Sequence, residues 1–259
     1  MLLGKLIKNI KPAYKSIRFN NIRFNSKDCK TNDIFFSIQG NKLNGNNYIK
    51  DAIKNGSKII VSNLNFEGFN KEKILFIKRK NPRKALAEAA SNFYTKKPKN
   101  IIAVTGTNGK TSIANFFYQI LSLSKKKAAA IGTLGVLSKK VKSKTNNTTI
   151  DPLKIHYILQ KLKGLKIDNV IIEASSHGLK QHRLDGINLK TALFTNLSRD
   201  HLDYHKTFKD YLNSKLILFD KLLLNKGNII FENGISQEKE LKKISKKKKL
   251  KIHKIGSEN

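Results

Sequence analysis

A chain of 259 residues with a hydrophobic content of 39% is long enough to bury a core, and it accommodates one large or two ordinary α/β domains. No apolar stretch approaches the roughly 20 residues that a membrane-spanning helix needs, and residues 1–11 do not resemble a signal peptide. The single cysteine, Cys29, excludes an internal disulfide, so we expect a reducing, cytoplasmic location.

The formal net charge of +34 comes almost entirely from lysines that are scattered over every segment. A nucleic-acid-binding protein more often concentrates arginine and aromatic residues on one face. We therefore interpret the charge as a solvated lysine-rich surface and expect no nucleic-acid partner, although such a surface suits phosphate-bearing ligands. A nucleic-acid-stimulated ATPase stays open as an alternative, which strongly salt-dependent binding to RNA or DNA would reveal.

Strand-like apolar runs alternate with helix-like segments along most of the chain, which is typical of parallel α/β sheets. The predicted strands cover residues 33–38, 58–62, 74–77, 100–105, 127–132, 169–174, 191–196 and 228–231. The predicted helices cover residues 47–55, 82–94, 110–123, 152–163 and 207–224, and a lysine-rich helix followed by a short strand is expected within residues 236–259.

A domain boundary is predicted at the polar stretch 95–100, which contains Pro98 and directly precedes an apolar strand. We expect a small amino-terminal α/β domain over residues 1–97 and a mostly parallel α/β domain over residues 98–259.

The strongest functional signal follows the predicted strand at 100–105, where a glycine-rich turn ends in Gly-Lys-Thr and leads into a predicted helix. Glycines let backbone amides approach phosphate oxygens, the lysine adds a mobile positive charge, and the threonine hydroxyl is a ligand for Mg²⁺. Val104 stands where the strict P-loop pattern has a glycine, so the turn is a shortened variant. The residues expected to bind the phosphates of ATP are Gly106, Thr107, Asn108, Gly109, Lys110, Thr111 and Ser112.

Two polar segments follow later strands. Glu173 ends an apolar strand, where α/β sheets place their ligands, and beside a P-loop such a carboxylate commonly completes the coordination of Mg²⁺. Gln181 and Arg183 are spaced to hold a substrate anion or amide, although an arginine on a loop is often only solvated. Residues 194–205 contain two histidines and two aspartates, which suit a second Mg²⁺ or acid–base chemistry.

Lys215 lies within an apolar stripe of the predicted helix at 207–224. A lysine among apolar neighbours usually extends its ammonium group to water. A buried lysine, by contrast, has a lowered pKa and a reactive amine. The pattern alone leaves both interpretations open.

These motifs, in this order and at this spacing, resemble the Mur ligase family. The segments that carry the resemblance are residues 25–27, 33–40, 44–45, 106–111, 173–183 and 195–205. The resemblance implies an amino-terminal uridine-nucleotide domain followed by an ATPase domain of the P-loop type. It also implies an ATP-dependent ligase of peptidoglycan precursor synthesis, which adds the third amino acid to UDP-N-acetylmuramoyl-L-alanyl-D-glutamate through an acyl phosphate.

The resemblance also implies roles for single residues. Lys110, Glu173, His201 and Lys215 would be catalytic. Thr111 and Glu173 would hold one Mg²⁺, His201 would help to hold a second, and Lys215 would react with CO₂ to form a carbamate that acts as a metal ligand. The residues that would contact the UDP-muramoyl-peptide are Ser26, Asn147, Thr148, Thr149, Ser175, Gln181 and Arg183.

The chain also departs from the family pattern. Asn25 and Lys27 replace the aspartate and arginine that flank Ser26 in the family, so weaker uridine contacts are expected there. The resemblance covers only about the first half of a family member and lacks its carboxy-terminal domain, which closes over ATP and selects the amino acid. We therefore expect little ligase activity from this polypeptide alone, with the missing domain supplied elsewhere as one possibility.

Two alternatives to a partial ligase of this kind stay open. One is a module that binds the nucleotide or the UDP precursor without catalysis. The other is a different ligase of the Mur and folylpolyglutamate synthetase superfamily. Folylpolyglutamate synthetases tend to have Gly-Lys-Gly-Ser in this turn, whereas Thr111 and Ser112 follow Lys110 here.

Overall fold

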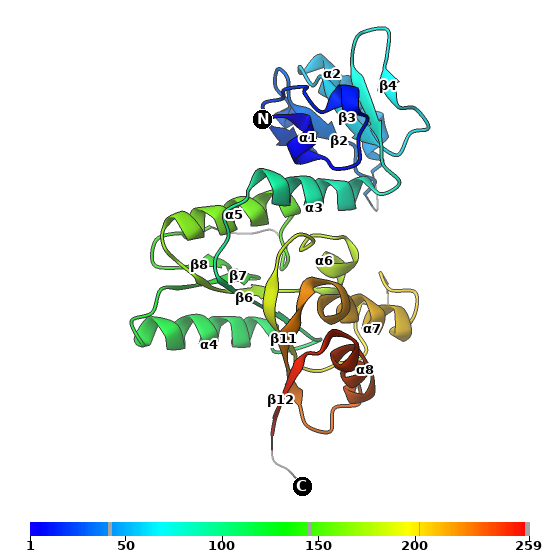
Figure 1. The fold of residues 1–259 in the computed structure, drawn as a ribbon. Coiled ribbons are helices and arrows are strands. Elements are labelled where there is room, and N and C mark those ends of the chain that lie inside the picture. The colour runs from blue at the N-terminus through cyan, green and yellow to red at the C-terminus, as the bar shows by residue number, and fades with distance from the viewer. Residues whose placement is uncertain (41–42, 144–146, 202, 257–259) are drawn as a thin grey trace. The chain divides into compact units, whose positions relative to one another are not determined.

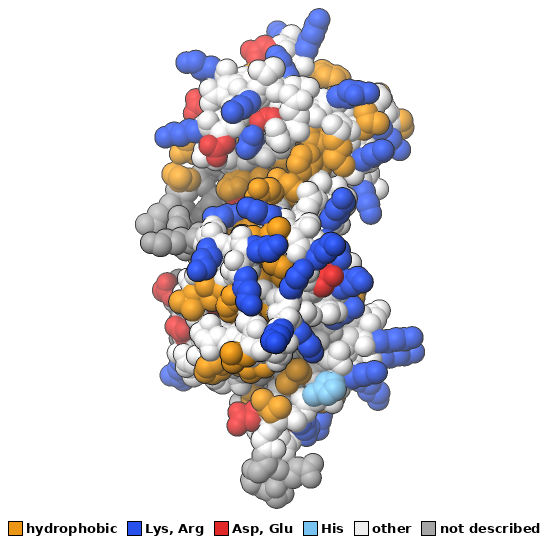
Figure 2. All heavy atoms as spheres, turned by 90° about the vertical axis from the view of Figure 1, so that its left-hand side faces the viewer, with side chains coloured by type: hydrophobic (Ala, Val, Ile, Leu, Met, Phe, Trp, Pro, Cys, Tyr) orange, Lys and Arg blue, Asp and Glu red, His pale blue; other side chains and the backbone are white. Residues whose placement is uncertain are grey.

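The computed structural model describes residues 1–40, 43–143, 147–201 and 203–256, which form two compact units, Met1–Phe93 and Tyr94–Asn259 (Figure 1). The division falls just before the Pro98 stretch at which the sequence predicts a boundary. In the described part of the chain, none of the helices combines the length and apolar character that crossing a bilayer requires. Lys and Arg side chains are spread across the face that Figure 2 shows.

The first unit is built on a five-stranded sheet with the order β1-β2-β3-β5-β4. Its strands are β1 (Ile22–Arg23), β2 (Ile34–Phe36), β3 (Ile59–Ser62), β4 (Gly68–Phe69) and β5 (Leu75–Lys78). All neighbouring pairs are parallel except β4 with β5. The helices are α1 (Leu3–Leu6), α2 (Ile49–Lys54) and α3 (Pro82–Phe93), with single 3₁₀ turns at Pro12–Tyr14, Ser26–Asp28 and Gly45–Tyr48. The sheet packs against α2 through an apolar cluster that includes Phe35, Ile60 and Phe76.

The second unit contains a seven-stranded sheet with the order β12-β11-β10-β6-β9-β7-β8, in which only β8 is antiparallel to its neighbour. The strands are β6 (Asn100–Thr105), β7 (Ala128–Gly132), β8 (Gly135–Leu137), β9 (Asn169–Glu173), β10 (Leu189–Phe194), β11 (Leu223–Glu232) and β12 (Lys251–Ile255). The helices are α4 (Lys110–Leu123), α5 (Pro152–Gly164), α6 (Ser176–Lys180), α7 (Phe208–Ile217) and α8 (Glu238–Lys248), and a π-helical turn, Leu218–Leu222, extends α7. The expected α/β class with mostly parallel sheets is confirmed.

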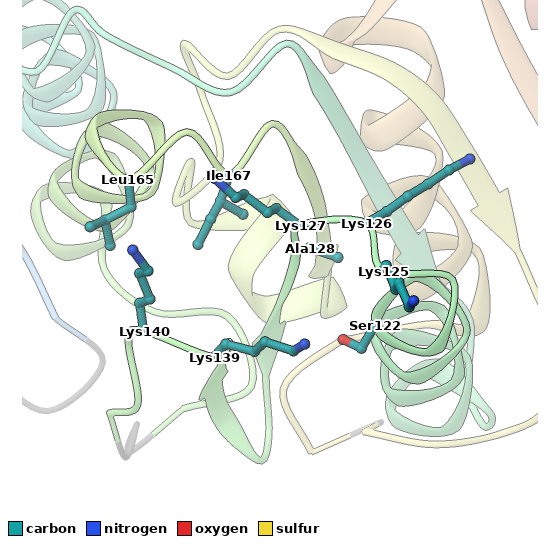
Figure 3. Close-up of a pocket in the computed structure, with 9 residues that line it drawn as sticks. All are labelled: Ser122, Lys125, Lys126, Lys127, Ala128, Lys139, Lys140, Leu165 and Ile167. Carbon is teal, nitrogen blue, oxygen red and sulfur yellow. The ribbon is translucent and has the colours of Figure 1, made fainter.

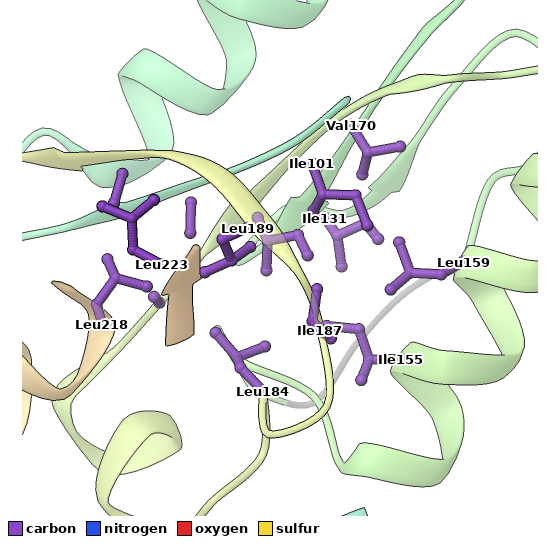
Figure 4. Close-up of a cluster of buried hydrophobic side chains, with 14 of the residues drawn as sticks. Ile101, Ile131, Ile155, Leu159, Val170, Leu184, Ile187, Leu189, Leu218 and Leu223 are labelled. Carbon is purple, nitrogen blue, oxygen red and sulfur yellow. The ribbon is translucent and has the colours of Figure 1, made fainter. Parts of the chain in front are cut away.

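Alternate residues of the central strands point to opposite faces of this sheet, and both faces are buried. Figure 4 shows the larger core, in which Ile101 and Val170 face Leu159 of α5. On the other face, Val104 and its neighbours pack against α4. Because β6 and β9 are covered on both faces, they are apolar along nearly their whole length, and this is why they are recognisable in the sequence.

The predicted helix at 207–224 is wrong at its carboxyl end. α7 gives way to the π-helical turn, and β11 begins at Leu223 rather than at residue 228. Leu218, Phe219 and Leu223 are almost completely buried in the larger core, so tertiary packing decides the conformation of this segment. The two-residue strands β1 and β4 were not predicted, because a period of two cannot be recognised over so short a run.

Candidate functional site

The carboxyl ends of three adjacent parallel strands gather the predicted motifs of the second unit. β6 lies between β10 and β9, so the turn after β6 is flanked by the segments that follow the other two strands. Ligands of open α/β sheets bind at this edge, where connections leave toward opposite faces.

The glycine-rich turn depends on glycine at two positions. Gly106 has φ +151° and Gly109 has φ +84°, a region that L side chains rarely adopt. A Cβ atom on Gly106 would lie 1.8 Å from Thr195 Oγ1, so the next loop packs directly against this backbone.

The segment after β10 fixes the shape of the turn. Thr195 donates its hydroxyl hydrogen to the carbonyl oxygen of Asn108 at 2.7 Å. The amide of Asn108 donates to Asn196 Oδ1 at 2.9 Å, and the amide of Thr107 donates to the carbonyl oxygen of Asn196 at 3.0 Å. Sequence reasoning missed this role of Thr195 and Asn196, because it requires β10 to lie beside β6.

Helix α4 starts directly after the turn, at Lys110, with Gly109 as its N-cap. Glycine has no side chain to cap the first amides, which are therefore available to an anion at the positive end of the helix. Ser112 lies exposed in this first turn. The sequence prediction for α4, residues 110–123, agrees with the structure.

Lys110 and Lys215 converge on the same backbone carbonyl. Lys110 Nζ donates to the carbonyl oxygen of Gly106 at 2.9 Å and to that of Thr107 at 2.7 Å. Lys215 Nζ donates to the carbonyl oxygen of Gly106 at 2.7 Å and lies 4.4 Å from the centroid of the Tyr211 ring. The Lys215 residue is only 1% exposed, so it does not extend to water as surface lysines do.

Burial sets the protonation of both lysines. It lowers the pKa of Lys110, with Glu173 and Asp200 acting in the opposite direction. Burial also lowers the pKa of Lys215 to about 7, with a further contribution from the charge of Lys110 and opposition from Asp200. Burial therefore favours the neutral amine at both positions, and most strongly at Lys215.

Glu173 lies at the end of β9 with its carboxylate surrounded by hydroxyl and amide donors. Thr111 Oγ1 donates to Oε2 at 2.8 Å, Thr133 Oγ1 donates to the same oxygen at 3.1 Å, and the amide of Thr133 donates to Oε1 at 2.9 Å. A Cβ atom on Gly132 would lie 2.0 Å from Oε1, so glycine makes room for the carboxylate. A carboxylate and a hydroxyl are the hard oxygen donors that Mg²⁺ prefers, and the pair fits this ion. Thr133 was not predicted from the sequence.

His201 is at the open side of the site. Its side chain is 48% exposed, and Nε2 lies 3.4 Å from Asp200 Oδ2. Its ring centroid is 6.3 Å from that of Tyr211, whose ring also contacts Lys215. Among the described residues, no three side chains of the His, Cys, Asp and Glu types gather as a metal cluster, so a second metal site rests on His201 and Lys215 as a proposal. Leu202, within the same motif, lies outside the described residues.

Four of the residues predicted to bind substrate hold one another. Thr149 Oγ1 donates to the carbonyl oxygen of Glu173 at 2.8 Å and lies 3.1 Å from Ser175 Oγ. Arg183 donates to the carbonyl oxygen of Thr149 and, at 2.8 Å, to Gln181 Oε1. These contacts fix the segment around Thr149 at the end of β9, so at least part of their role is structural.

The remaining predicted substrate residues are more scattered. Thr148 Oγ1 lies 3.1 Å from Thr133 Oγ1, and Asn147 is exposed. Ser26 belongs to the first unit, where it is 5% exposed and starts a 3₁₀ turn. The Asn25 side chain accepts a hydrogen bond from the amide of Lys27 at 3.2 Å, so asparagine caps this turn.

His205, the second histidine of the segment 194–205, is buried and joins the start of α6 to α7, a structural role that the sequence did not predict. His205 Nε2 lies 3.0 Å from Ser176 Oγ, and Nδ1 lies 3.4 Å from Asp210 Oδ2. Lys180 forms an ion pair of 2.6 Å with the same carboxylate. These bonds anchor α7, and with it Lys215, to the end of β9.

The chain matches the Mur ligase middle domain over residues 104–259 and the Mur ligase family catalytic domain over residues 18–94. It is 40% identical over 233 residues to UDP-N-acetylmuramoyl-L-alanyl-D-glutamate–2,6-diaminopimelate ligase of Rickettsia montanensis, an alignment that covers 88% of this chain and 48% of the relative. The corresponding ligase of Clostridium tetani is 41% identical over 249 residues, with coverage of 95% and 51%.

Solved structures agree with the sequence relatives. This chain superposes on a structure of UDP-N-acetylmuramoyl-L-alanyl-D-glutamate–2,6-diaminopimelate ligase with a TM-score of 0.81 and 25% sequence identity. The match covers 98% of this chain and 52% of the solved chain. MurF ligase of Thermotoga maritima in complex with ADP shares the fold, with a TM-score of 0.61, 18% identity and coverage of 92% and 51%. The chain thus spans about half the length of the relatives it matches. The resemblance found in the sequence is confirmed, and the chain belongs to the Mur ligase family.

Proposed function

We propose that this chain carries the nucleotide-binding and precursor-binding parts of an ATP-dependent ligase that adds the third amino acid to UDP-N-acetylmuramoyl-L-alanyl-D-glutamate. The observation that carries the proposal is the convergence of Lys110 and Lys215 on Gly106, beside the hydrogen-bonded pair of Thr111 and Glu173. The relatives are named for 2,6-diaminopimelate, which is therefore the first amino acid to test.

The reaction has to bring a substrate carboxylate against a triphosphate, and both are anions. Lys110 and the amides at the start of α4 offset this repulsion and hold the phosphates in line for transfer. Mg²⁺, held by Thr111 and Glu173, would neutralise charge on the transferring phosphoryl group. A carboxylate oxygen attacks the γ-phosphorus of ATP, the bond to the bridging oxygen breaks and ADP leaves, which gives an acyl phosphate. The amine of the incoming amino acid then attacks the acyl carbon, the C–O bond to phosphate breaks, and the nitrogen loses a proton as the amide forms.

Lys215 is proposed to react with CO₂ before the ligase reaction. The neutral amine attacks the carbon of CO₂, a C–N bond forms, and one proton leaves the nitrogen to give a carbamate of charge −1. Burial and the charge of Lys110 lower the pKa of Lys215 to about 7, which supplies the neutral amine near neutral pH. The carbamate and His201 would then offer oxygen and nitrogen ligands to a second Mg²⁺.

The first unit is proposed to bind the uridine nucleotide of the precursor, with Ser26 as a contact. Its parallel α/β sheet and its match to a Mur ligase family domain support this assignment. Replacing Ser26 by alanine is expected to weaken binding of UDP-N-acetylmuramoyl-dipeptide severalfold in isothermal titration. Replacing the exposed Ser16 by alanine is the matched control and should leave binding unchanged.

The nucleotide assignment is tested by titrating the chain with a non-hydrolysable ATP analogue and Mg²⁺. Saturable binding that is lost in Lys110→Ala is expected, and an analogue that binds both proteins equally would refute the assignment. Phosphate release with ATP, UDP-precursor and diaminopimelate then measures ligase turnover, which we expect to be low for this polypeptide alone. Efficient product formation would contradict that expectation.

A nucleotide-binding module without catalysis is the second candidate, since the chain spans about half the length of its relatives. Binding of nucleotide without phosphate release, even when a polypeptide equivalent to the other half of a relative is added, would favour it. For either function we expect the cytoplasm, where nucleotide precursors and ATP are available.

A further inference from the structure

A hollow of about 210 Å³ lies where α4 ends and β7 begins (Figure 3). Strand β7 starts there with Ala128 and ends with Gly132, against the Glu173 carboxylate. At about 3.3 Å per residue, the four steps from Ala128 to Gly132 separate the hollow from the nucleotide site by about 13 Å. The hollow lies at the amino end of β7, and the nucleotide site lies at its carboxyl end. The hollow is therefore no part of the catalytic machinery described above.

Among the residues that the structure describes, no acidic side chain lines this hollow, whereas five lysines do: Lys125, Lys126, Lys127, Lys139 and Lys140. None of the five takes part in an ion pair within the described portion of the chain. Like charges that share a concave surface repel one another and raise the local concentration of anions.

Helix stability accounts for only two of these lysines. Lys125 and Lys126 directly follow the last turn of α4, where cations compensate the negative end of the helix dipole. In Figure 3, Lys126 also extends away from the other side chains. Lys127, Lys139 and Lys140 belong to no helix, so the dipole does not explain them.

The backbone around the hollow is held in place by hydrogen bonds. Ser138 is 1% exposed, and its hydroxyl oxygen accepts the amides of Lys140 at 3.3 Å and Val141 at 2.7 Å while donating to the carbonyl oxygen of Val141 at 2.9 Å. Across the hollow, the amide of Lys126 donates to the carbonyl oxygen of Leu121 at 2.8 Å. An incoming anion thus meets ammonium groups on preformed turns, which reduces the entropy cost of binding.

The volume of the hollow and its apolar lining residues limit the size of the anion that it can bind. Ala128 and Ile167 are almost completely buried beneath it, and Leu165 closes one side. Cavities that hold drug-sized ligands measure about 300–1,000 Å³, so this one suits a smaller molecule. Lysine ammonium groups bind phosphate as point charges.

We propose that the lysines at positions 127, 139 and 140 form a binding site for a small anion that carries two or more phosphate charges. Two sources share this chemistry, inorganic pyrophosphate and a phosphorylated sugar. The proposal does not depend on the ligase function, because the hollow uses none of the nucleotide-site residues.

The first test reads individual lysines. The intact chain is acetylated with and without pyrophosphate, and in a parallel arm with fructose 1,6-bisphosphate, and the modified lysines are quantified by mass spectrometry. A severalfold fall in reactivity at Lys127, Lys139 and Lys140, with no change at the exposed Lys243 and Lys246 of α8, is expected. The arm with stronger protection identifies the source, and equal protection of all these lysines would overturn the proposal. Lys110 is read separately and reports on the nucleotide site.

The second test compares variants of equal charge. Lys139→Gln/Lys140→Gln and Lys243→Gln/Lys246→Gln each remove two exposed lysines, and neither pair is involved in an ion pair that the structure records. In isothermal titration with the better anion, the first variant is expected to bind about tenfold more weakly, and the second should bind like the parent. Equal losses in both variants would show a general effect of net charge and refute the site.

Discussion

Thr111 donates its hydroxyl hydrogen to Glu173, with a distance of 2.8 Å between Oγ1 and Oε2, although the two residues are 62 positions apart. The pairing of β6 with β9, in which Val104 lies opposite Glu173, brings the start of α4 to this carboxylate. The side chain of Thr111 is therefore oriented by the end of a neighbouring strand. Adjacent strand ends, rather than a local motif, create the proposed Mg²⁺ position.

The first prediction concerns this hydroxyl. Thr111→Val keeps the volume but removes the oxygen, so the Mg²⁺-dependent part of the affinity for an ATP analogue is expected to fall roughly tenfold. Thr111→Ser keeps the hydroxyl and should retain most of the affinity. Titrations with and without Mg²⁺ measure both, and equal affinities in the two variants would count against the assignment.

The second prediction concerns the space beside Glu173. A Cβ atom in Gly132→Ala would lie 2.0 Å from Oε1 and 2.3 Å from the carboxyl carbon, so the buried carboxylate has to move. We expect a loss of about 1–3 kcal/mol in the free energy of unfolding, together with weaker nucleotide binding.

The control for this prediction is Gly164→Ala. An added Cβ atom at Gly164 meets no heavy atom within 4 Å, and Gly164 is the last residue of α5. This variant should be neutral or more stable by up to about 1 kcal/mol. Urea unfolding measures both variants, and similar effects would show that the contact with Glu173 does not matter.

The third prediction concerns the carbamate. With ¹³C-labelled bicarbonate, a carbamate resonance is expected in the NMR spectrum of the parent protein and should be lost in Lys215→Gln. Lys243→Gln, on the exposed surface of α8, should keep the signal. A resonance that survives the Lys215 substitution would assign the carbamate elsewhere.

The fourth prediction concerns acid stability. His156 is fully buried, and its Nε2 lies 3.0 Å from the carbonyl oxygen of Asp185, so the neutral ring donates from Nε2. Burial, with a further contribution from the charge of Lys97, lowers the pKa of His156 to about 4, while the hydrogen bond to Asp185 opposes this shift.

Between pH 6.5 and 4 the unfolded chain binds a proton at this histidine and the folded chain does not. Stability should therefore be unaffected above about pH 6.5 and should fall through this window, by about 3 kcal/mol in all. Urea unfolding at several pH values is expected to show this loss in the parent and in the exposed-site control His253→Gln, but a smaller loss in His156→Gln. The same acid dependence in all three proteins would rule out His156 as its source.

Local patterns predicted much of the fold. The strand at residues 100–105 and the helix at residues 110–123 have the bounds that the sequence indicated. The apolar run of the strand, the two glycines of the turn and the helical period are each visible within a short stretch of sequence. The end of the helix after Lys215 was not predictable in this way. Burial of Leu218 and Phe219 against the sheet determines the π-helical turn there.

The amino-acid sequence by itself determined the α/β class, the glycine-rich turn before α4 and the family, since each depends on residue types at fixed short spacings. Only the tertiary structure decided that Thr195 and Asn196 hold the turn, that Thr133 completes the surroundings of Glu173, and that Lys215 is buried rather than solvated. The physical reason is that these contacts depend on which strands are neighbours. The order of strands in a sheet follows from the packing of both faces together, which no single segment encodes.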